Sequence, residues 1–278
     1  MINLIYNEFI KTLYKKRTYI SFVLIIILIP FIIWSINNGG SSLEKNIYGQ
    51  LEDSFIFIGS LVNGYFASYI IIAVFITNMP FLVTIVASEI VSGEYSKGTF
   101  RLYLTRPIWR NKVLLSKLII IYSYTTVMLL FFFCYTLLLG ILIMGKGDLA
   151  VFHNGLLFLD QTDIIWRFCL AFFISNTTML TITTLCFLFS TIFNNSVTPI
   201  ILTISIVFIG TAISFIPINI FESINPYLFT GYIDFFLTAF YDPIPTMGLI
   251  QCIITQFIWC VIFLSISFYI FNNKDILT

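Results

Sequence analysis

The sequence predicts an all-α integral membrane protein with six transmembrane helices. Hydrophobic residues make up 59% of the 278 residues and the mean hydropathy is +1.00, which is too apolar for a soluble domain with a polar outer surface. A bilayer-crossing helix needs about 20 mainly apolar residues. The stretches that meet this length are residues 19–36, 61–87, 113–144, 164–193, 197–216 and 247–271. Their apolar residues are continuous rather than alternating, which favours helices over a β-barrel.

Residues 1–18 precede the first span and are predicted to form an amphipathic helix. Ile2, Ile5, Phe9 and Leu13 recur at helical spacing, whereas the polar residues of this segment fall on other faces. We expect this helix to lie in the inner membrane interface, and an ordinary cytoplasmic tail is the alternative. Residues 19–278 then form a single six-span transmembrane domain.

The distribution of basic residues predicts the orientation of the spans. With the N-terminus inside the cell, only Lys45, Lys146 and Arg167 of the 14 basic residues face outward. Because cytoplasmic loops carry the excess of Lys and Arg, both termini are expected to be cytoplasmic. The richness in Ile, Phe and Asn is typical of AT-rich bacterial genomes, so the membrane is predicted to be the cytoplasmic membrane of a bacterium.

The segment Ser88–Lys117, between the second and third spans, is the longest strongly charged stretch of the chain. It is predicted to be a cytoplasmic loop that contains a short helix, and such a helix can act as a lever against a soluble partner. A solvated loop that only sets the topology is the alternative. The residues predicted to contact the partner are Glu89, Glu94, Lys97, Gly98, Thr99, Arg101, Arg106, Pro107 and Arg110.

The outer loops are predicted to differ from one another. Residues 37–60 and 145–163 have the polar composition of flexible connections. Residues 217–246 are too apolar for a solvated loop and too interrupted for a full crossing, so we expect a re-entrant hairpin that dips into the outer leaflet. The residues predicted to matter for this hairpin are Glu222, Asn225, Pro226 and Asp234.

The polar residues inside the spans have two interpretations, which the sequence leaves open. Hydroxyl side chains of the fourth span permit close helix packing, or they line a weakly polar path at a dimer seam. Pro80 is expected to kink the second span. Without a charged selectivity group, such a path suits an amphipathic or hydrophobic cargo. The path candidates are Asn63, Asn78, Asn176, Thr177, Thr181 and Thr184.

Several functional motifs are missing from the sequence. There is no GxxxxGK[ST] phosphate loop, no HExxH, no GxSxG, and no Cys and His spacing typical of a metal site. The chain is therefore not expected to be an enzyme or to hold a cofactor or metal, and no nucleic-acid partner is expected. Because the chain has no ATP-binding motif of its own, the simplest expectation is that a partner protein supplies the energy.

The charged segment resembles that of a known family. The pattern of Glu94, Gly98–Thr99, Arg101, Leu104, Arg106–Pro107, Arg110 and Lys117 is similar to the first cytoplasmic loop of ABC type-2 exporter permeases. The ending Phe271-Asn-Asn-Lys274-Asp275 and the pair Asn225–Pro226 also resemble this family.

The resemblance implies a set of partners. Such permeases form homodimers or heterodimers in membrane lipid and bind two copies of a separate ABC ATPase subunit, which holds ATP and Mg. The loop around Glu94 would be the coupling helix that enters a cleft on the ATPase. The expected function is therefore export of an amphipathic peptide, such as an antimicrobial peptide, or of an antibiotic or lipid-like substrate. The alternatives are a permease for metal-cluster or sulfur species or sodium, and a non-transporting immunity or sensor protein.

Overall fold

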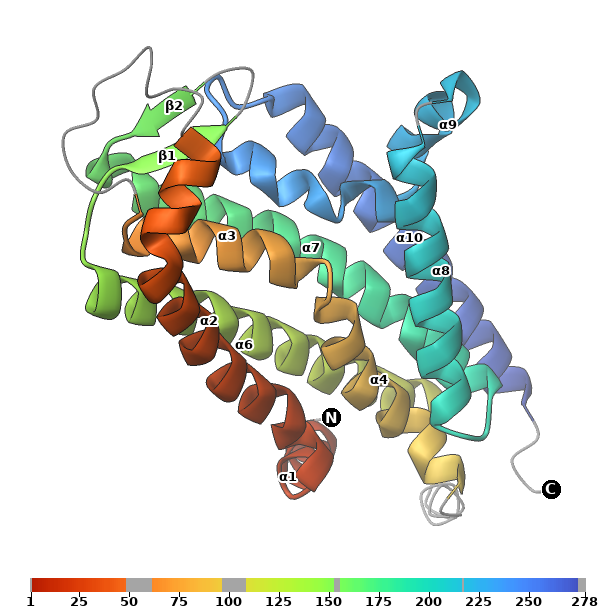
Figure 1. Ribbon diagram of the computed structural model, residues 1–278. Coiled ribbons are helices and arrows are strands. Elements are labelled where there is room, and N and C mark those ends of the chain that lie inside the picture. Colours follow the sequence, from red (N-terminus) through yellow and green to blue (C-terminus); the bar gives the residue numbers. More distant parts are fainter. Residues whose placement is uncertain (1, 49–61, 97–108, 153–155, 217, 275–278) are drawn as a thin grey trace.

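A computed structural model describes residues 2–48, 62–96, 109–152, 156–216 and 218–274 of the chain (Figure 1). Its long helices are α2 (Lys16–Tyr48), α6 (Arg110–Met144), α7 (Gln161–Ile192), α8 (Val197–Phe215) and α10 (Thr246–Asn273). Its shorter helices are α1 (Ile2–Leu13), α3 (Gly64–Ile76), α4 (Met79–Ser96) and α9 (Asn219–Ile224). Between α9 and α10 the chain forms the 3₁₀ turns η1 (Asn225–Tyr227), η2 (Phe229–Tyr232) and η3 (Asp234–Phe240).

The prediction of a helical protein with several membrane-length helices is confirmed. In the described ranges α2, α6, α7, α8 and α10 are each long and apolar enough to cross a bilayer. The pair α3 and α4 makes a sixth span if the two are counted together. Both termini, α1 and the end of α4 lie at one end of the bundle, which we call the terminus end (Figure 1).

Helix α7 is the centre of the bundle. In its most apolar stretch 67% of the residues are buried, compared with 22–33% in the other long helices. It packs against α4, α6, α8 and α10, and also against η3. The remaining long helices expose many Ile, Val, Leu and Phe side chains, as expected for surfaces that contact lipid.

The mostly helical fold contains one short β-ribbon that was not predicted. Residues 145–163, expected to be a flexible connection, contain an antiparallel two-stranded ribbon of β1 (Leu149–Phe152) and β2 (Leu156–Leu159). Leu149 pairs with Leu159 in its register. Leu149 and Val151 are fully buried, so the ribbon closes the end of the bundle opposite the termini (Figure 1).

The second span is broken rather than continuous. Helices α3 and α4 meet at a bend of 51° between Ile76 and Met79. Pro80 lies in the first turn of α4, where its missing N–H costs no intrahelical hydrogen bond. The break thus lies just before the proline, and α4 continues to Ser96, well past the expected span end at residue 87.

The first span is also longer than expected. Helix α2 continues to Tyr48, through the Gly-Gly-Ser-Ser stretch that was expected to begin a polar loop. Glycine in a helix interior costs only about 1 kcal/mol relative to alanine, so it weakens a helix without ending it.

Helices α3 and α6 approach each other closely at two glycines. A Cβ atom on Gly140 would collide with the side chain of Ser68 and the backbone of Gly64. The Ser68 hydroxyl donates to the carbonyl oxygen of Thr136 at 3.1 Å across this contact. Small residues with a hydroxyl between them are typical of helix contacts inside membranes.

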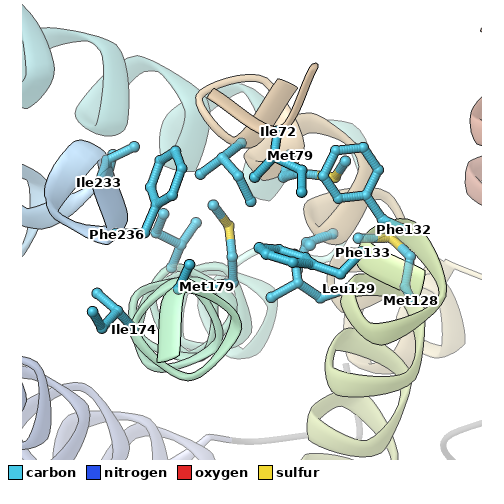
Figure 2. Packing of buried hydrophobic residues seen from close by; sticks show 14 of the residues in the cluster. Ile72, Met79, Met128, Leu129, Phe132, Phe133, Ile174, Met179, Ile233 and Phe236 are labelled. Carbon is cyan, nitrogen blue, oxygen red and sulfur yellow. The ribbon is translucent and has the colours of Figure 1, made fainter. Parts of the chain in front are cut away.

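Part of the hydrophobic core lies beside the break in the second span. Figure 2 shows Met79 and Ile72, on either side of the break, near Met179 of α7 and Phe236 of η3. Phe132 and Leu129 of α6 complete the cluster, and both are fully buried. The core therefore joins the break to the segment between α8 and α10.

The segment 225–240 is held by donors from the middle of α10. Gln256 donates from Nε2 to the carbonyl oxygen of Phe229 at 2.9 Å, and the Trp259 indole N–H donates to that of Tyr227 at 2.8 Å. Irregular backbone at membrane depth needs such partners for its polar groups. Trp259 thus serves this segment from a position well inside its helix.

Candidate functional site

The polar face of α1 points into the protein and its apolar face points outward. Glu8 is 3% exposed, whereas Ile2 is 82% exposed. Phe9 and Leu13, which share the apolar stripe, are exposed as well. Helix α1 packs mainly on α6 and also touches α2. This orientation brings the charged side chains of α1 against the inner helices.

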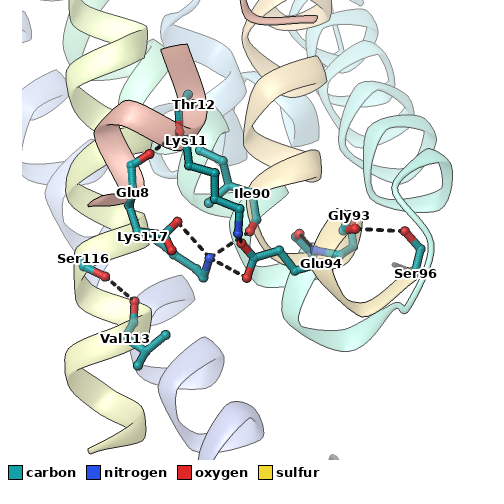
Figure 3. A network of polar contacts seen from close by, with 12 residues as sticks. Glu8, Lys11, Thr12, Ile90, Gly93, Glu94, Ser96, Val113, Ser116 and Lys117 are labelled. Atoms are coloured by element: carbon teal, nitrogen blue, oxygen red, sulfur yellow. Dashed lines mark hydrogen bonds and ion pairs between the residues drawn. The ribbon is translucent and has the colours of Figure 1, made fainter. Parts of the chain in front are cut away.

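Those side chains belong to a buried ion cluster formed by Glu8, Lys11, Glu94 and Lys117 (Figure 3). Lys117 of α6 is fully buried, and its Nζ lies 3.0 Å from Glu8 Oε2 and 2.7 Å from Glu94 Oε2. The same Nζ donates to the carbonyl oxygen of Ile90. Lys11 pairs with the other oxygen of Glu94. The cluster thus joins α1, α4 and α6.

A second ion pair lies one helical turn and a half earlier on α4. Glu89 is 7% exposed and its Oε1 lies 3.5 Å from Arg17 Nη1 at the start of α2. Gly93 makes room for it, because a Cβ atom there would meet Glu89 Cγ at 2.7 Å. Helix α4 is therefore tied to both α1 and α2 by charge.

Buried charges of this kind are costly unless they are paired. An isolated ammonium or carboxylate at membrane depth is rare, and it is usually paired where it occurs. The cluster satisfies this condition by using two carboxylates and two ammonium groups. Removal of one partner leaves a buried charge uncompensated, so the four side chains form one unit.

Arg110 and Lys274 form a third polar contact region at the terminus end. Arg110 Nη1 donates to the carbonyl oxygens of Asn272 and Lys274, at 3.0 and 3.1 Å. Lys274 Nζ donates to the carbonyl oxygens of Thr191 and Ile192, at 3.0 and 2.9 Å. These donors cap the last turns of α10 and α7, where carbonyl groups lack helical partners.

Tyr95 completes this region from the side of α4. Lys274 Nζ lies 4.4 Å from the centre of its ring, a cation–π contact. Burial lowers the pKa of the Lys274 ammonium from its usual value, because desolvation disfavours the charge. Two residues of the charged segment, Tyr95 before residues 97–108 and Arg110 after them, therefore contact Lys274.

Two of the predicted partner-contacting residues lie elsewhere than expected. Glu89 and Glu94 are buried in helix α4 and contact this chain's own cations, instead of lying in an aqueous loop. The physical reason is internal pairing, which removes the need for water. Arg110 is half-buried and holds the end of α10. The residues Lys97, Gly98, Thr99, Arg101, Arg106 and Pro107 lie outside the described residues.

The two path asparagines of the second span, Asn63 and Asn78, lie at different places. Asn63 caps α3: its Oδ1 accepts from the backbone N–H of Tyr65 and Phe66, and its Nδ2 donates to the carbonyl oxygen of Asp148. Asn78 is exposed at the break between α3 and α4, where it borders a cavity of about 180 Å³ that is lined mainly by α2 and α4, with one residue each from α3 and α6.

The hydroxyl groups of the fourth span both pack helices and border a groove. Thr184 shares a hydrogen bond of 2.7 Å with Tyr122 of α6, and Thr181 contacts Cys260 of α10. Thr177 and Thr181 line a groove of about 300 Å³ between α6, α7 and α10. Asn176 is half-buried next to them. The predicted path residues thus divide between separate places, and the structure does not bring them into one groove.

The marked residues of the predicted hairpin hold it to the bundle. Asn225 accepts from the Ser214 hydroxyl at 2.7 Å, and the carbonyl oxygen of Pro226 accepts from Tyr232 and Thr255. Asp234 accepts from Thr77, at the break in the second span. Glu222 lies in α9, and its side chain is outside the described set.

Arg167 fixes the far end of the same segment. The residue is 5% exposed, and its Nη1 donates to the carbonyl oxygens of Ala239 and Tyr241, at 3.3 and 2.8 Å. These contacts cap η3 against α7. Arg167 thus holds the segment 225–240 to α7 through its hydrogen bonds.

Sequence reasoning missed Glu8, Lys11 and Lys117 as members of one site. The signal for Lys117 was present, because a lysine followed directly by a long apolar run needs a partner. Its partners are 109 residues away in the case of Glu8, and no local pattern links them. Within the described ranges, no three His, Cys, Asp or Glu residues are grouped so that they could hold a metal ion.

Comparison with known proteins places this arrangement in context. Residues 4–210 match the model of a family described as ABC-2 family transporter protein. The uncharacterized protein YhcI of Bacillus subtilis (strain 168) is 28% identical over 200 residues, which cover 69% of this chain and 63% of that protein. The match therefore spans somewhat less than two thirds of the relative's length.

Proposed function

The chain belongs to the ABC-2 family of transporter proteins, and from this premise we propose that it is the membrane permease subunit of an ATP-driven exporter. The family makes it a component of membrane transport rather than an enzyme. In the proposal a separate ABC ATPase binds and hydrolyses ATP with Mg, and this chain converts the movement of the ATPase into movement of its helices. The chain itself holds no cofactor.

The observation that carries this proposal is the buried ion cluster. It joins α1, α4 and α6 at the end of α4, two residues before the charged segment leaves the described part of the chain. A force on that segment is transmitted to α4 through Glu94 and from there to α6 through Lys117. Glu94 acts here as a positioning residue: it holds the segment in place, and the ATPase contacts belong to residues 97–108.

The contacts of Arg110 and Lys274 support the same role. They tie the start of α6 to the ends of α7 and α10, so the segment is anchored to the bundle on both sides. Since α7 is the central helix, a displacement at the terminus end reaches most of the bundle. Rigid packed helices transmit such displacements over long distances.

The proposed assembly follows the family resemblance. Two copies of the ATPase bind two permease chains, which form a homodimer or heterodimer in the cytoplasmic membrane of a bacterium. Both termini and the charged segment are cytoplasmic, in accord with their position at one end of the bundle and with the bias of basic residues (Figure 1). The segment 225–240 is the re-entrant hairpin of the outer leaflet.

The proposed cargo is an amphipathic peptide, an antibiotic or a lipid-like molecule. The cavity at Asn78 and the groove at Thr177 have mostly apolar walls. Asn78 is the polar side chain of the first, and Thr177, Thr181 and Gln256 are among those of the second. Such walls suit a molecule with an apolar body and few polar groups. Metal-cluster or sulfur species and sodium are the alternative cargoes.

Affinity purification tests the assembly. The tagged chain is extracted in mild detergent, and we expect an ABC ATPase to copurify with it. Recovery of the chain without any ATPase would refute the exporter assignment and favour a non-transporting immunity or sensor protein. The amount of ATPase recovered is then compared for Glu94→Gln and for Asp160→Asn, an exposed carboxylate at the opposite end of the bundle.

ATP hydrolysis by the reconstituted complex tests the coupling role. We expect Glu94→Gln to lower lipid-stimulated hydrolysis at least tenfold while Asp160→Asn leaves it unchanged. Glu94→Asp keeps the charge and should restore part of the activity. Equal activity of Glu94→Gln and Asp160→Asn, with both variants folded, would remove Glu94 from the coupling pathway.

A further inference from the structure

An apolar groove lies at the corner between α1 and α2. It has a volume of about 280 Å³ and almost no polar surface. Its walls come from three helices, namely Phe9 and Leu13 of α1, Tyr19 and Phe22 of α2, and Ser123 and Val127 of α6. We call it the corner groove.

The corner groove opens on a surface that faces the membrane. Phe9 and Leu13 belong to the outward apolar stripe of α1, and they are 46% and 42% exposed. Tyr19 and Val127, on the other two walls, are about as exposed. In an aqueous setting such a patch would be unfavourable, so its natural contact is an acyl chain.

The same corner carries more positive than negative charge. Its carboxylates are those of Glu8, Glu89 and Glu94, and each pairs with one or more of Lys11, Arg17 and Lys117. Lys15 and Lys16 remain, and among the described residues neither has a carboxylate within ion-pair distance. The corner thus has an excess of two positive charges.

Lys15 and Lys16 are close to the groove along the chain. Lys15 precedes α2 and Lys16 begins it, and they lie between Leu13 and Thr18, which both line the groove. Lys16 is exposed and lies one turn before Tyr19 on the same face of α2. Burial lowers the pKa of the Lys15 ammonium from its usual value, even though Glu89 and Glu94 attract it. An anion at this place would relieve that cost.

We propose that the corner groove is a binding site for an anionic phospholipid of the adjoining leaflet. One acyl chain lies in the groove between α1, α2 and α6, and the headgroup phosphate contacts Lys15 and Lys16. The apolar groove and the unmatched positive charge are independent observations, and a phospholipid satisfies both. The site requires neither an ATPase partner nor a cargo.

Native mass spectrometry of the full chain in an uncharged detergent tests this site. The chain is titrated with dioleoyl phosphatidylglycerol or dioleoyl phosphatidylcholine, and we expect the first to be retained more tightly. A basic residue near an anionic lipid contributes roughly a fivefold gain in affinity, so Lys15→Gln/Lys16→Gln should weaken retention about 30-fold. The matched control is Lys112→Gln/Lys146→Gln, which removes the same charge elsewhere.

The groove itself is tested by filling it. Ser123→Phe places a ring in the groove and should abolish tight retention of phosphatidylglycerol. Ser265→Phe, at an exposed position of α10 outside the groove, should not. Thermal unfolding of each variant without lipid shows whether it is folded.

Three outcomes would overturn the proposal. The two lipids are retained equally, or the Lys15/Lys16 and control variants behave alike, or Ser123→Phe retains phosphatidylglycerol as the unchanged chain does. A last experiment uses glycerol 3-phosphate, a small phosphate anion without an acyl chain. If it stabilises the chain as much as the lipid does, the site is one for small anions and the groove has no part in it.

Discussion

Lys117 is the side chain on which the buried ion cluster depends most. It is fully buried and contacts two carboxylates, at 3.0 Å to Glu8 and 2.7 Å to Glu94. At an effective dielectric constant of about 20, each of these contacts at 3.0 and 2.7 Å is worth about 6 kcal/mol before desolvation is subtracted. Desolvation of the buried charges offsets much of that sum.

We predict that Lys117→Met lowers the free energy of unfolding by about 3–5 kcal/mol, the usual cost of breaking a buried ion pair. The loss arises because Glu8 has no other ion-pair partner in the cluster of Figure 3, so its carboxylate stays buried without compensation. Equilibrium unfolding in mixed detergent micelles, followed by tryptophan fluorescence, measures the change.

The control is Lys112→Met on the same helix, where the lysine is exposed. Such surface substitutions change stability by about 0.5 kcal/mol or less. Adding Glu8→Gln to Lys117→Met removes the uncompensated charge and should recover a large part of the loss. If Lys117→Met costs no more than Lys112→Met, or if Glu8→Gln makes the double variant worse, the cluster does not stabilise the fold as described.

Three further predictions concern other contacts. Gly140→Ala should destabilise the protein by about 1–3 kcal/mol, because its Cβ meets the backbone of α3. Gly39→Ala lies in open space and should instead stabilise the protein by up to about 1 kcal/mol. Thermal unfolding of both variants shows whether each change in stability has the expected sign. Asn63→Ser keeps an oxygen that can cap α3 and loses the amide donor to Asp148. It should therefore cost less than Asn63→Ala by about 1 kcal/mol in the same assay, and equal losses would contradict the capping role. Arg167→Gln removes charge-assisted hydrogen bonds worth about 1.5–3 kcal/mol, so amide exchange in residues 234–241 should accelerate while exchange in α8 stays unchanged.

Much of the fold follows from hydrophobic length alone. Helices α6, α7, α8 and α10 overlap the apolar stretches expected at residues 113–144, 164–193, 197–216 and 247–271. Such stretches can be recognised in a sequence because a helix in the bilayer forms its backbone hydrogen bonds within itself. Long continuous apolar runs leave few other structures open to the chain.

The charged segment shows where this reasoning fails. Its charge predicts an aqueous loop, and the second span is therefore predicted to end at residue 87. In the structure α4 continues through Glu89 and Glu94 to Ser96, because the partners of both carboxylates come from distant parts of the chain. No local pattern of residues reveals a pairing between sites so far apart.

Two other features differ from the expectation in different ways. The kink expected at Pro80 is a break of 51° after Ile76, next to the buried Met79. The ribbon of β1 and β2 rests on two apolar runs of four residues, which are too short to be distinguished from loop residues by periodicity.

The pairing of Glu8 with Lys117 has a consequence for how the chain is made. The two residues are 109 positions apart, so at about 5–20 residues per second Lys117 is synthesised about 5–20 s after Glu8. Helix α1 therefore leaves the ribosome first but cannot dock until α6 has been inserted. During that interval its carboxylate must stay near water. In a nascent chain truncated before α6, the Glu8 carboxylate of α1 lacks its Lys117 partner, and this unpaired group is a mark by which quality-control proteases can recognise incomplete molecules.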